Sequence, residues 1–230
     1  MNNLLQSPLA FAALTFAVYA AAVFIYGRTK IFILHPVLVA IAVIIIILNT
    51  AGISYESYWK GGNYINIFLS PAVVALGVSL YREFEKIRKE AVPIIATTIF
   101  GSLSGVISAV VPALVMHLPP DIIISLAPKS VTTPIAMDIA ESLGGIPSLS
   151  AAIVIYTGIL GAVIGPAVLR ILHITQSSAV GLAMGFSAHG IGTARAIEIG
   201  ETEGAFSGLG ICLNGLATSI ITPVVIKFIF

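Results

Sequence analysis

Charged residues are scarce in this chain. They account for 9% of its 230 residues, whereas hydrophobic residues account for 58%, and the mean hydropathy is +1.07. A soluble domain carries about 25% charged residues, so the composition excludes an ordinary soluble protein and predicts a multi-pass membrane protein. The net charge is +1, and no basic cluster is suited to nucleic acid.

Cysteine is almost absent as well. Cys212 is the only one, which excludes an internal disulfide and says nothing about the redox compartment. The sequence also lacks metal-ligand spacing, a Gly-x-Ser-x-Gly elbow and a phosphate-binding loop, so we expect no enzyme, no cofactor and no metal. The N-terminus has neither a basic stretch nor a clear cleavage site, and residues 7–26 are therefore predicted to be a retained span.

Long apolar segments fill the rest of the chain. A helix crosses a bilayer with about 20 apolar residues. The predicted fold class is all-α, a polytopic transmembrane helix bundle of about seven spans plus one re-entrant or broken segment, residues 121–143. We expect a single transmembrane domain over residues 1–230. The candidate spans are residues 7–26, 31–50, 64–80, 92–118, 147–169, 178–200 and 205–226.

Charge placement orients these spans. The basic run at residues 82–89 is predicted to be cytoplasmic by the positive-inside rule. If residues 121–143 are re-entrant, Arg170 and Lys227 lie inside and the acidic residues 201–203 outside, whereas full crossing reverses all three. The rule favours the re-entrant alternative. Residues 31–118 and 147–230 would then form an inverted repeat with discontinuous helices.

Two polar stretches interrupt the apolar segments. Residues 128–134 read Pro-Lys-Ser-Val-Thr-Thr-Pro, and residues 187–196 read Ser-Ala-His-Gly-Ile-Gly-Thr-Ala-Arg-Ala. Proline interrupts helical hydrogen bonding, and each unsatisfied polar group in hydrocarbon costs several kcal/mol. Paired breaks of this kind indicate a transport site near the middle of the bilayer.

The first break has the groups that a small carboxylate needs. Lys129 would supply a fixed cation, although the alternative is that it snorkels to the interface. Ser130, Thr132 and Thr133 would donate hydrogen bonds. The half-helix that follows Pro134 would add the positive end of its dipole.

The second break would supply a matching set. Arg195 can hold a carboxylate through two hydrogen bonds, or it can form a helix-end ion pair with Glu198 or Glu201. His189 is either a packing residue or a proton carrier. The predicted substrate-binding residues of this break are Ser187, His189, Gly190, Gly192, Thr193 and Arg195.

Other polar residues in or near apolar segments are weaker candidates. Ionisable groups in a membrane are costly, which makes Asp138, Glu141 and His189 candidates for proton coupling. The alternative is that both carboxylates lie in water at the interface. Ser70, Pro71 and Asn214 are cavity-lining candidates, although a lone amide such as Asn214 more often joins helices. Glycine pairs at close-packing spacing are predicted to serve helix packing; they are Gly101 and Gly105, Gly161 and Gly165, Gly181 and Gly185, and Gly204 and Gly208.

The motifs at residues 128–136 and 189–196 resemble those of the LrgB/CidB family, and the likeness runs from about His35 to the end. The family includes relatives of a plastidic glycolate/glycerate translocator and bacterial pyruvate-uptake proteins. This implies a secondary transporter of small monocarboxylates (glycolate, glycerate, lactate or pyruvate), with proton coupling favoured over sodium. The resemblance also implies an alternative, a holin- or antiholin-like regulator of murein hydrolase export and cell lysis.

The chemistry of the two breaks favours transport, because forming a hole by oligomerisation needs no convergent cation and hydroxyls. The expected location is the bacterial inner membrane. The expected partners are a small carboxylate, the lipid bilayer, a small membrane protein of the LrgA/CidA type and further copies of the chain.

Overall fold

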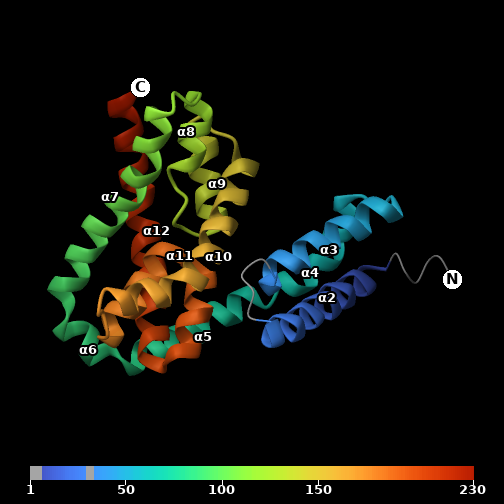
Figure 1. The fold of residues 1–230 in the computed structure, drawn as a ribbon, viewed down its shortest axis with the longest axis horizontal. Helices are drawn as coiled ribbons and strands as arrows, with labels where there is room; N and C mark the ends of the chain where they lie inside the picture. The colour runs from blue at the N-terminus through green and yellow to red at the C-terminus, as the bar shows by residue number, and fades with distance from the viewer. Residues whose placement is uncertain (1–6, 30–33) are drawn as a thin grey trace. The chain divides into compact units, whose positions relative to one another are not determined.

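The computed structural model describes residues 7–29 and 34–230, and within these ranges every regular element is a helix (Figure 1). The all-helical prediction is therefore confirmed. The chain divides into two compact units, residues 1–75 and 76–230. A single transmembrane domain over the whole chain stays a prediction.

The first unit is built from α2 (Pro8–Thr29), α3 (Pro36–Ala51) and α4 (Tyr55–Asn66), and α5 (Leu69–Arg82) begins in it. Gly52 ends α3 in the left-handed conformation, with φ 63°. The hydroxyl of Ser54 then caps α4. Gly61 of α4 packs so closely on α2 that a Cβ there would clash with Phe11.

The second unit contains three long helices and several shorter pieces. Its helices are α6 (Phe84–Lys89), α7 (Ala91–Val115), α8 (Pro120–Leu126), α9 (Thr133–Ser142), α10 (Pro147–Ile171), α11 (Ser177–Ile199) and α12 (Glu201–Ile229). In Figure 1, α7, α10 and α12 run along the length of this unit, and α8 and α9 lie at the end where α7 stops.

Among the described residues, four helices are long and apolar enough to cross a membrane: α2, α7, α10 and α12. They match four of the predicted spans, and the shorter apolar helix α3 overlaps a fifth. The predicted span at residues 64–80 is divided, because α4 ends at Asn66 and α5 begins at Leu69. The predicted number of seven spans is therefore not confirmed, whereas a helical membrane bundle is.

The segment from α8 to α9 folds back on itself. The hydroxyl of Ser125, near the end of α8, accepts a hydrogen bond from the backbone of Ile146, at 2.7 Å. The hydroxyl of Ser150 donates to the carbonyl of Ser125, at 2.6 Å. The chain thus returns after α9 to the level of α8, which is the geometry of the re-entrant alternative.

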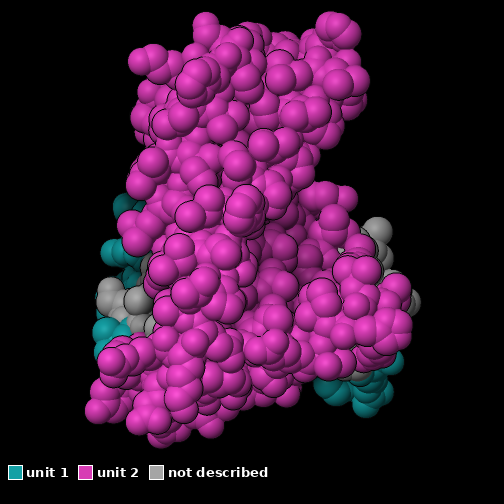
Figure 2. Space-filling view, turned by 90° about the vertical axis from the view of Figure 1, so that its left-hand side faces the viewer, with its two compact units in different colours: residues 1–75 teal, residues 76–230 magenta. Residues whose placement is uncertain are grey.

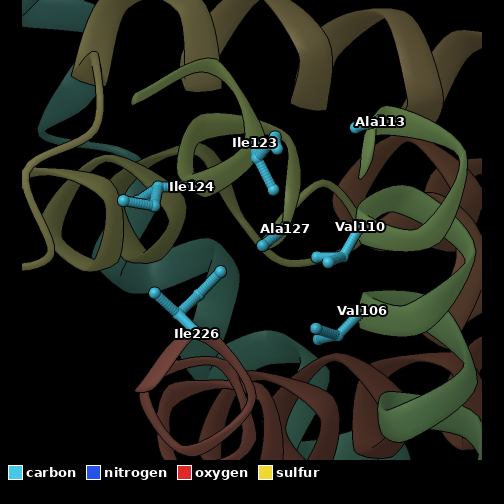
Figure 3. Close-up of a cluster of buried hydrophobic side chains, with 7 residues drawn as sticks. All are labelled: Val106, Val110, Ala113, Ile123, Ile124, Ala127 and Ile226. Carbon is cyan, nitrogen blue, oxygen red and sulfur yellow. The ribbon is translucent and has the colours of Figure 1, made fainter. Parts of the chain in front are cut away.

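A cluster of buried aliphatic side chains fixes this folded-back segment in place (Figure 3). It joins α8 to α7 and to the last turns of α12. Each side chain is at most 7% exposed, so close van der Waals contacts stabilise the cluster, because apolar surface gains little hydrophobic stabilisation when it leaves lipid. The residues are Val106, Val110, Ala113, Ile123, Ile124, Ala127 and Ile226.

Helix α11 also reverses direction. His189 has φ 41° and ψ −132°, far from helical values, so two half-helices meet there. In a straight helix, Met184 and Gly192 would lie about 12 Å apart along the axis. Instead, a Cβ on Gly192 would collide with the carbonyl of Met184. The predicted break at residues 187–196 is therefore present, at His189, whereas a single continuous helix over the predicted span 178–200 is not.

This reversal also corrects the predicted orientation. The acidic residues 201–203 were expected on the side opposite the basic run at residues 82–89. Instead, Arg82 pairs with Glu201 at 2.9 Å, and the hydroxyl of Thr202 donates to Glu83 at 3.1 Å. Because α11 folds back, the chain stays at the same end of the unit before α12 begins. Lys227, at the far end of α12, accordingly lies at the opposite end from residues 82–89.

Candidate functional site

Asn214 joins the tips of both folded-back segments. It is buried near the middle of α12, at 1% exposure. Its Nδ2 donates to the carbonyl of Ser130 at 2.9 Å and to the carbonyl of Phe186 at 3.2 Å. Its Oδ1 accepts from the hydroxyls of Ser102 at 2.7 Å and Thr218 at 3.1 Å. All four hydrogen bonds that an amide side chain makes are thus formed.

These bonds satisfy backbone groups that the two breaks release. Phe186 belongs to the turn just before the kink at His189, and Ser130 lies between α8 and α9. A carbonyl left unpaired at membrane depth would cost several kcal/mol. The amide of Asn214 therefore stabilises both breaks at one point, and Asn214 serves to join elements, as a lone amide in a span commonly does.

A cavity of about 660 Å³ lies beside these tips, and one face of the second unit is visibly hollowed in Figure 2. The walls of the cavity come from α7, α10, the first half of α11 and the tip between α8 and α9. Small residues of α7, Gly101 and Gly105, leave room on one wall. The polar residues that line the cavity are Thr97, Ser104, Ser108, Lys129, Ser130, Thr157 and Ser187.

Lys129 is the only charged residue among the described residues that line the cavity. It is half-buried, and its Nζ donates to the hydroxyl of Ser130 at 3.3 Å. In the described ranges it has no carboxylate partner, since the ion pairs there are Arg82 with Glu201 and Arg195 with Glu198. One cation surrounded by hydroxyls and facing no carboxylate is an arrangement suited to a small anion.

Some residues predicted from the first break reach the cavity and others do not. Lys129 and Ser130 line it. Thr132 and Thr133 are half-buried at the start of α9 and are not part of its lining. That helix begins at Thr133, with Pro134 in its first turn, whereas the predicted half-helix follows Pro134.

Of the residues predicted from the second break, one lines the cavity and two pack against other helices. Ser187 lines the cavity, but its hydroxyl donates to Ala183, one turn earlier, at 2.6 Å. The Nε2 of His189 lies 2.9 Å from the carbonyl of Val154. The hydroxyls of Thr193 and Ser207 lie 2.7 Å apart.

The glycines of the second break and Arg195 also lie away from the cavity lining. Gly192 is buried against Met184, whereas Gly190 is exposed with open space beside it. Arg195 forms an exposed ion pair with Glu198 at 2.5 Å. The helix-end alternative for Arg195 is therefore the one that the structure shows.

The remaining candidates are not brought to the cavity. Asp138 and Glu141 are exposed, in agreement with the interfacial alternative. Pro71 is exposed, and it belongs to the first unit. The side chain of Ser70 lies outside the described part of the chain.

The hydroxyls contributed by α7 and α10 were missed from the sequence. Thr97, Ser104 and Ser108 occupy one face of α7 together with Gly101 and Gly105, at intervals of three, four and seven residues. That small, polar stripe is visible in the sequence, but the glycines were interpreted as packing contacts only.

Comparison with known proteins assigns the chain to a family. Residues 15–228 match the LrgB-like family. The uncharacterized protein YwbG of Bacillus subtilis is 40% identical over 94% of this chain and 96% of its own length. The holin-like protein CidB of Staphylococcus epidermidis is 32% identical over the full length of both chains. The antiholin-like protein LrgB of B. subtilis is 31% identical over 97% of each. No solved structure matches the chain. With its long apolar helices, the chain is a multi-pass membrane protein that belongs to the LrgB-like family.

Proposed function

We propose that this protein acts in the membrane as a holin- or antiholin-like regulator. The observation that carries the proposal is the whole-length similarity to relatives with holin-like and antiholin-like names, from α2 to α12. The residues of the two breaks favoured carboxylate transport. The names of the relatives support a holin- or antiholin-like function better. Control of murein hydrolase export together with an LrgA/CidA-type partner is the finer form of the same proposal.

The small, polar stripe on α7 suits this function. A hole through a membrane needs surfaces that water can wet, and most exposed side chains of the long helices are apolar. Ser104 and Ser108 are exposed on α7, and each hydroxyl donates to its own helix at 2.9 Å. Their oxygens remain free to accept hydrogen bonds from water, so this face would line an opening formed between copies.

Carboxylate transport is the second candidate, favoured by one specific observation. Lys129 enters a cavity of about 660 Å³ without a carboxylate partner among the described residues. A monocarboxylate such as glycolate, glycerate, lactate or pyruvate would neutralise it and accept hydrogen bonds from Ser130. Alternating access would then separate and rejoin the two tips that meet at Asn214.

Reconstitution into liposomes separates the two functions. One set of vesicles holds a fluorescent dye, and another measures uptake of radiolabelled glycolate and pyruvate with and without an inward proton gradient. The holin-like function predicts dye release that rises more steeply than linearly with the protein-to-lipid ratio, because copies must assemble. Lys129→Gln should leave this release intact.

Transport predicts the opposite pattern. Uptake would saturate, dye would stay inside, and Lys129→Gln would abolish uptake. Lys227→Gln is the matched control, since it removes the same charge from an exposed position at the end of α12. Saturable uptake without dye release would contradict the holin-like proposal.

A further inference from the structure

The basic run before α7 leaves part of its positive charge unneutralised. Arg82 pairs with Glu201 at 2.9 Å, and the Nζ of Lys86 lies 5.4 Å from the centroid of the Phe206 ring. Arg88 and Lys89 are exposed and form no ion pair within the described ranges. Glu85 lies beside them and lines the same pocket, so two cations there face one carboxylate.

An apolar groove of about 390 Å³ begins at Arg88. It follows the first turns of α7 from Ala91 to Ile99, a distance of about 12 Å along the helix, and α12 forms its other wall. The hydroxyl of Thr98 donates to its own helix at 2.8 Å, so that residue offers a ligand no donor. The lining consists of Phe84, Ile87, Arg88, Ala91, Ile94, Ile95, Thr98, Ile99, Leu209 and Leu213.

The position of the groove along α7 indicates what fills it. Polar and charged residues at 82–90 give way to an apolar helix at Ala91, which is where a span leaves the headgroup region for hydrocarbon. The end of the groove at Arg88 therefore lies at the level of the lipid headgroups, and its apolar part lies at the level of the acyl chains. Basic residues at such a position attract anionic lipids.

We propose that this groove binds an anionic phospholipid, with the phosphate on Arg88 and Lys89 and an acyl chain along α7 between Ala91 and Ile99. The guanidinium can hold two phosphate oxygens at once. The site lies apart from Lys129 and does not depend on the proposed function of the protein.

Native mass spectrometry of the full chain in detergent tests the proposal, with phosphatidylglycerol and phosphatidylcholine of the same acyl chains as probes. Wild type should bind phosphatidylglycerol more tightly. Arg88→Gln should weaken that binding about five-fold, because one cation near an anionic headgroup contributes about 1 kcal/mol. Ala91→Trp should weaken binding of either lipid, because the indole fills the groove.

Arg28→Gln is the matched control. Arg28 is an exposed basic residue at the end of α2, whose guanidinium lies 4.5 Å from the Phe24 ring centroid. This variant should bind phosphatidylglycerol like wild type. Equal binding of the two lipids by wild type would overturn the proposal, and so would unchanged phosphatidylglycerol binding in Arg88→Gln.

Discussion

At the scale of single residues, Asn214 does what no apolar or charged side chain could do at its position. Its amide offers two donors to two backbone carbonyls and one acceptor to two hydroxyls, and it carries no charge that would need to be desolvated. Leucine would fill a similar volume without any of these bonds. Aspartate would place a carboxylate oxygen against the carbonyls of Ser130 and Phe186.

Asn214→Leu should therefore destabilise the protein by about 2 to 4 kcal/mol, since two buried carbonyls lose their partners. The thermal midpoint in detergent should fall by roughly 5–15 °C. Asn214→Asp should cost at least as much, because the carboxylate repels both carbonyls.

Ser219→Ala provides the comparison on the same helix. The hydroxyl of Ser219 donates only to Gly215, one turn earlier, at 2.8 Å, so its removal should change the midpoint by about 2 °C or less. An Asn214→Leu midpoint as high as that of Ser219→Ala would show that Asn214 does not hold the two tips together.

Single residues also differ in how far the sequence predicts their roles. The position of Lys129 at a cavity could be predicted, because a lysine among prolines and hydroxyls in an apolar chain is costly to keep in a membrane unless it has polar surroundings. The partners of Asn214 could not be predicted, since Ser130 lies 84 positions away in sequence and Ser102 lies 112. Arg195 illustrates the converse, because Glu198, three residues away, was already a sufficient partner.

At the scale of elements, glycines determine how closely α11 packs on its neighbours. A Cβ on Gly181 would lie 2.5 Å from the carbonyl of Glu203 in α12, and one on Gly161 would lie 2.6 Å from the Cβ of Ala188. Gly185 is more crowded still, against the carbonyl of Ser207. These neighbours are backbone atoms or short side chains, so they cannot rotate away.

Gly185→Ala should consequently separate α11 from α12 and cost about 1 to 3 kcal/mol, despite the better helix propensity of alanine. Thermal unfolding in detergent measures the loss. Gly77→Ala introduces the same methyl group into α5, where no described atom lies within 4 Å, and it should be neutral or stabilising by up to about 1 kcal/mol. Equal midpoints for the two variants would contradict close packing at Gly185.

Apolar length predicted helices well and predicted their course poorly. Hydropathy located α7, α10 and α12 because long apolar runs leave few other structures in a membrane. The break between α8 and α9 was predicted because Pro128 and Pro134 interrupt the helix. The reversal in α11 has no proline, and its apolar composition looks the same whether the helix is straight or folded back. Only His189 next to Gly190 and Gly192 signalled it.

At the scale of the whole second unit, a long helix followed by a folded-back segment occurs twice. α7 leads into α8 and α9, and α10 leads into α11. The two segments start from opposite ends of the unit, and their tips meet at Asn214. This arrangement agrees with discontinuous helices at a shared site. A repeat with the predicted boundaries, residues 31–118 and 147–230, remains a prediction.

This arrangement predicts on which side of the membrane the ends of each folded-back segment lie, and cysteine labelling can measure that. If neither folded-back segment crosses the membrane, the two ends of each segment lie on the same side. The basic run at residues 82–89 is expected to be cytoplasmic, so α7 and α12 run outward and α10 runs inward. Cys212 is the only cysteine, and Cys212→Ser therefore provides a background in which single cysteines report alone.

In that background, Met116→Cys and Ser142→Cys should both react with a membrane-impermeant maleimide added to intact cells. Gln176→Cys and Ile199→Cys should react only after the membrane is opened. All four positions are exposed at the ends of the two segments. Opposite labelling of residues 116 and 142 would mean that the first segment crosses the membrane. Opposite labelling of residues 176 and 199 would mean that the second segment crosses the membrane, as predicted for residues 178–200, and would place Glu201 away from Arg82, in conflict with their ion pair.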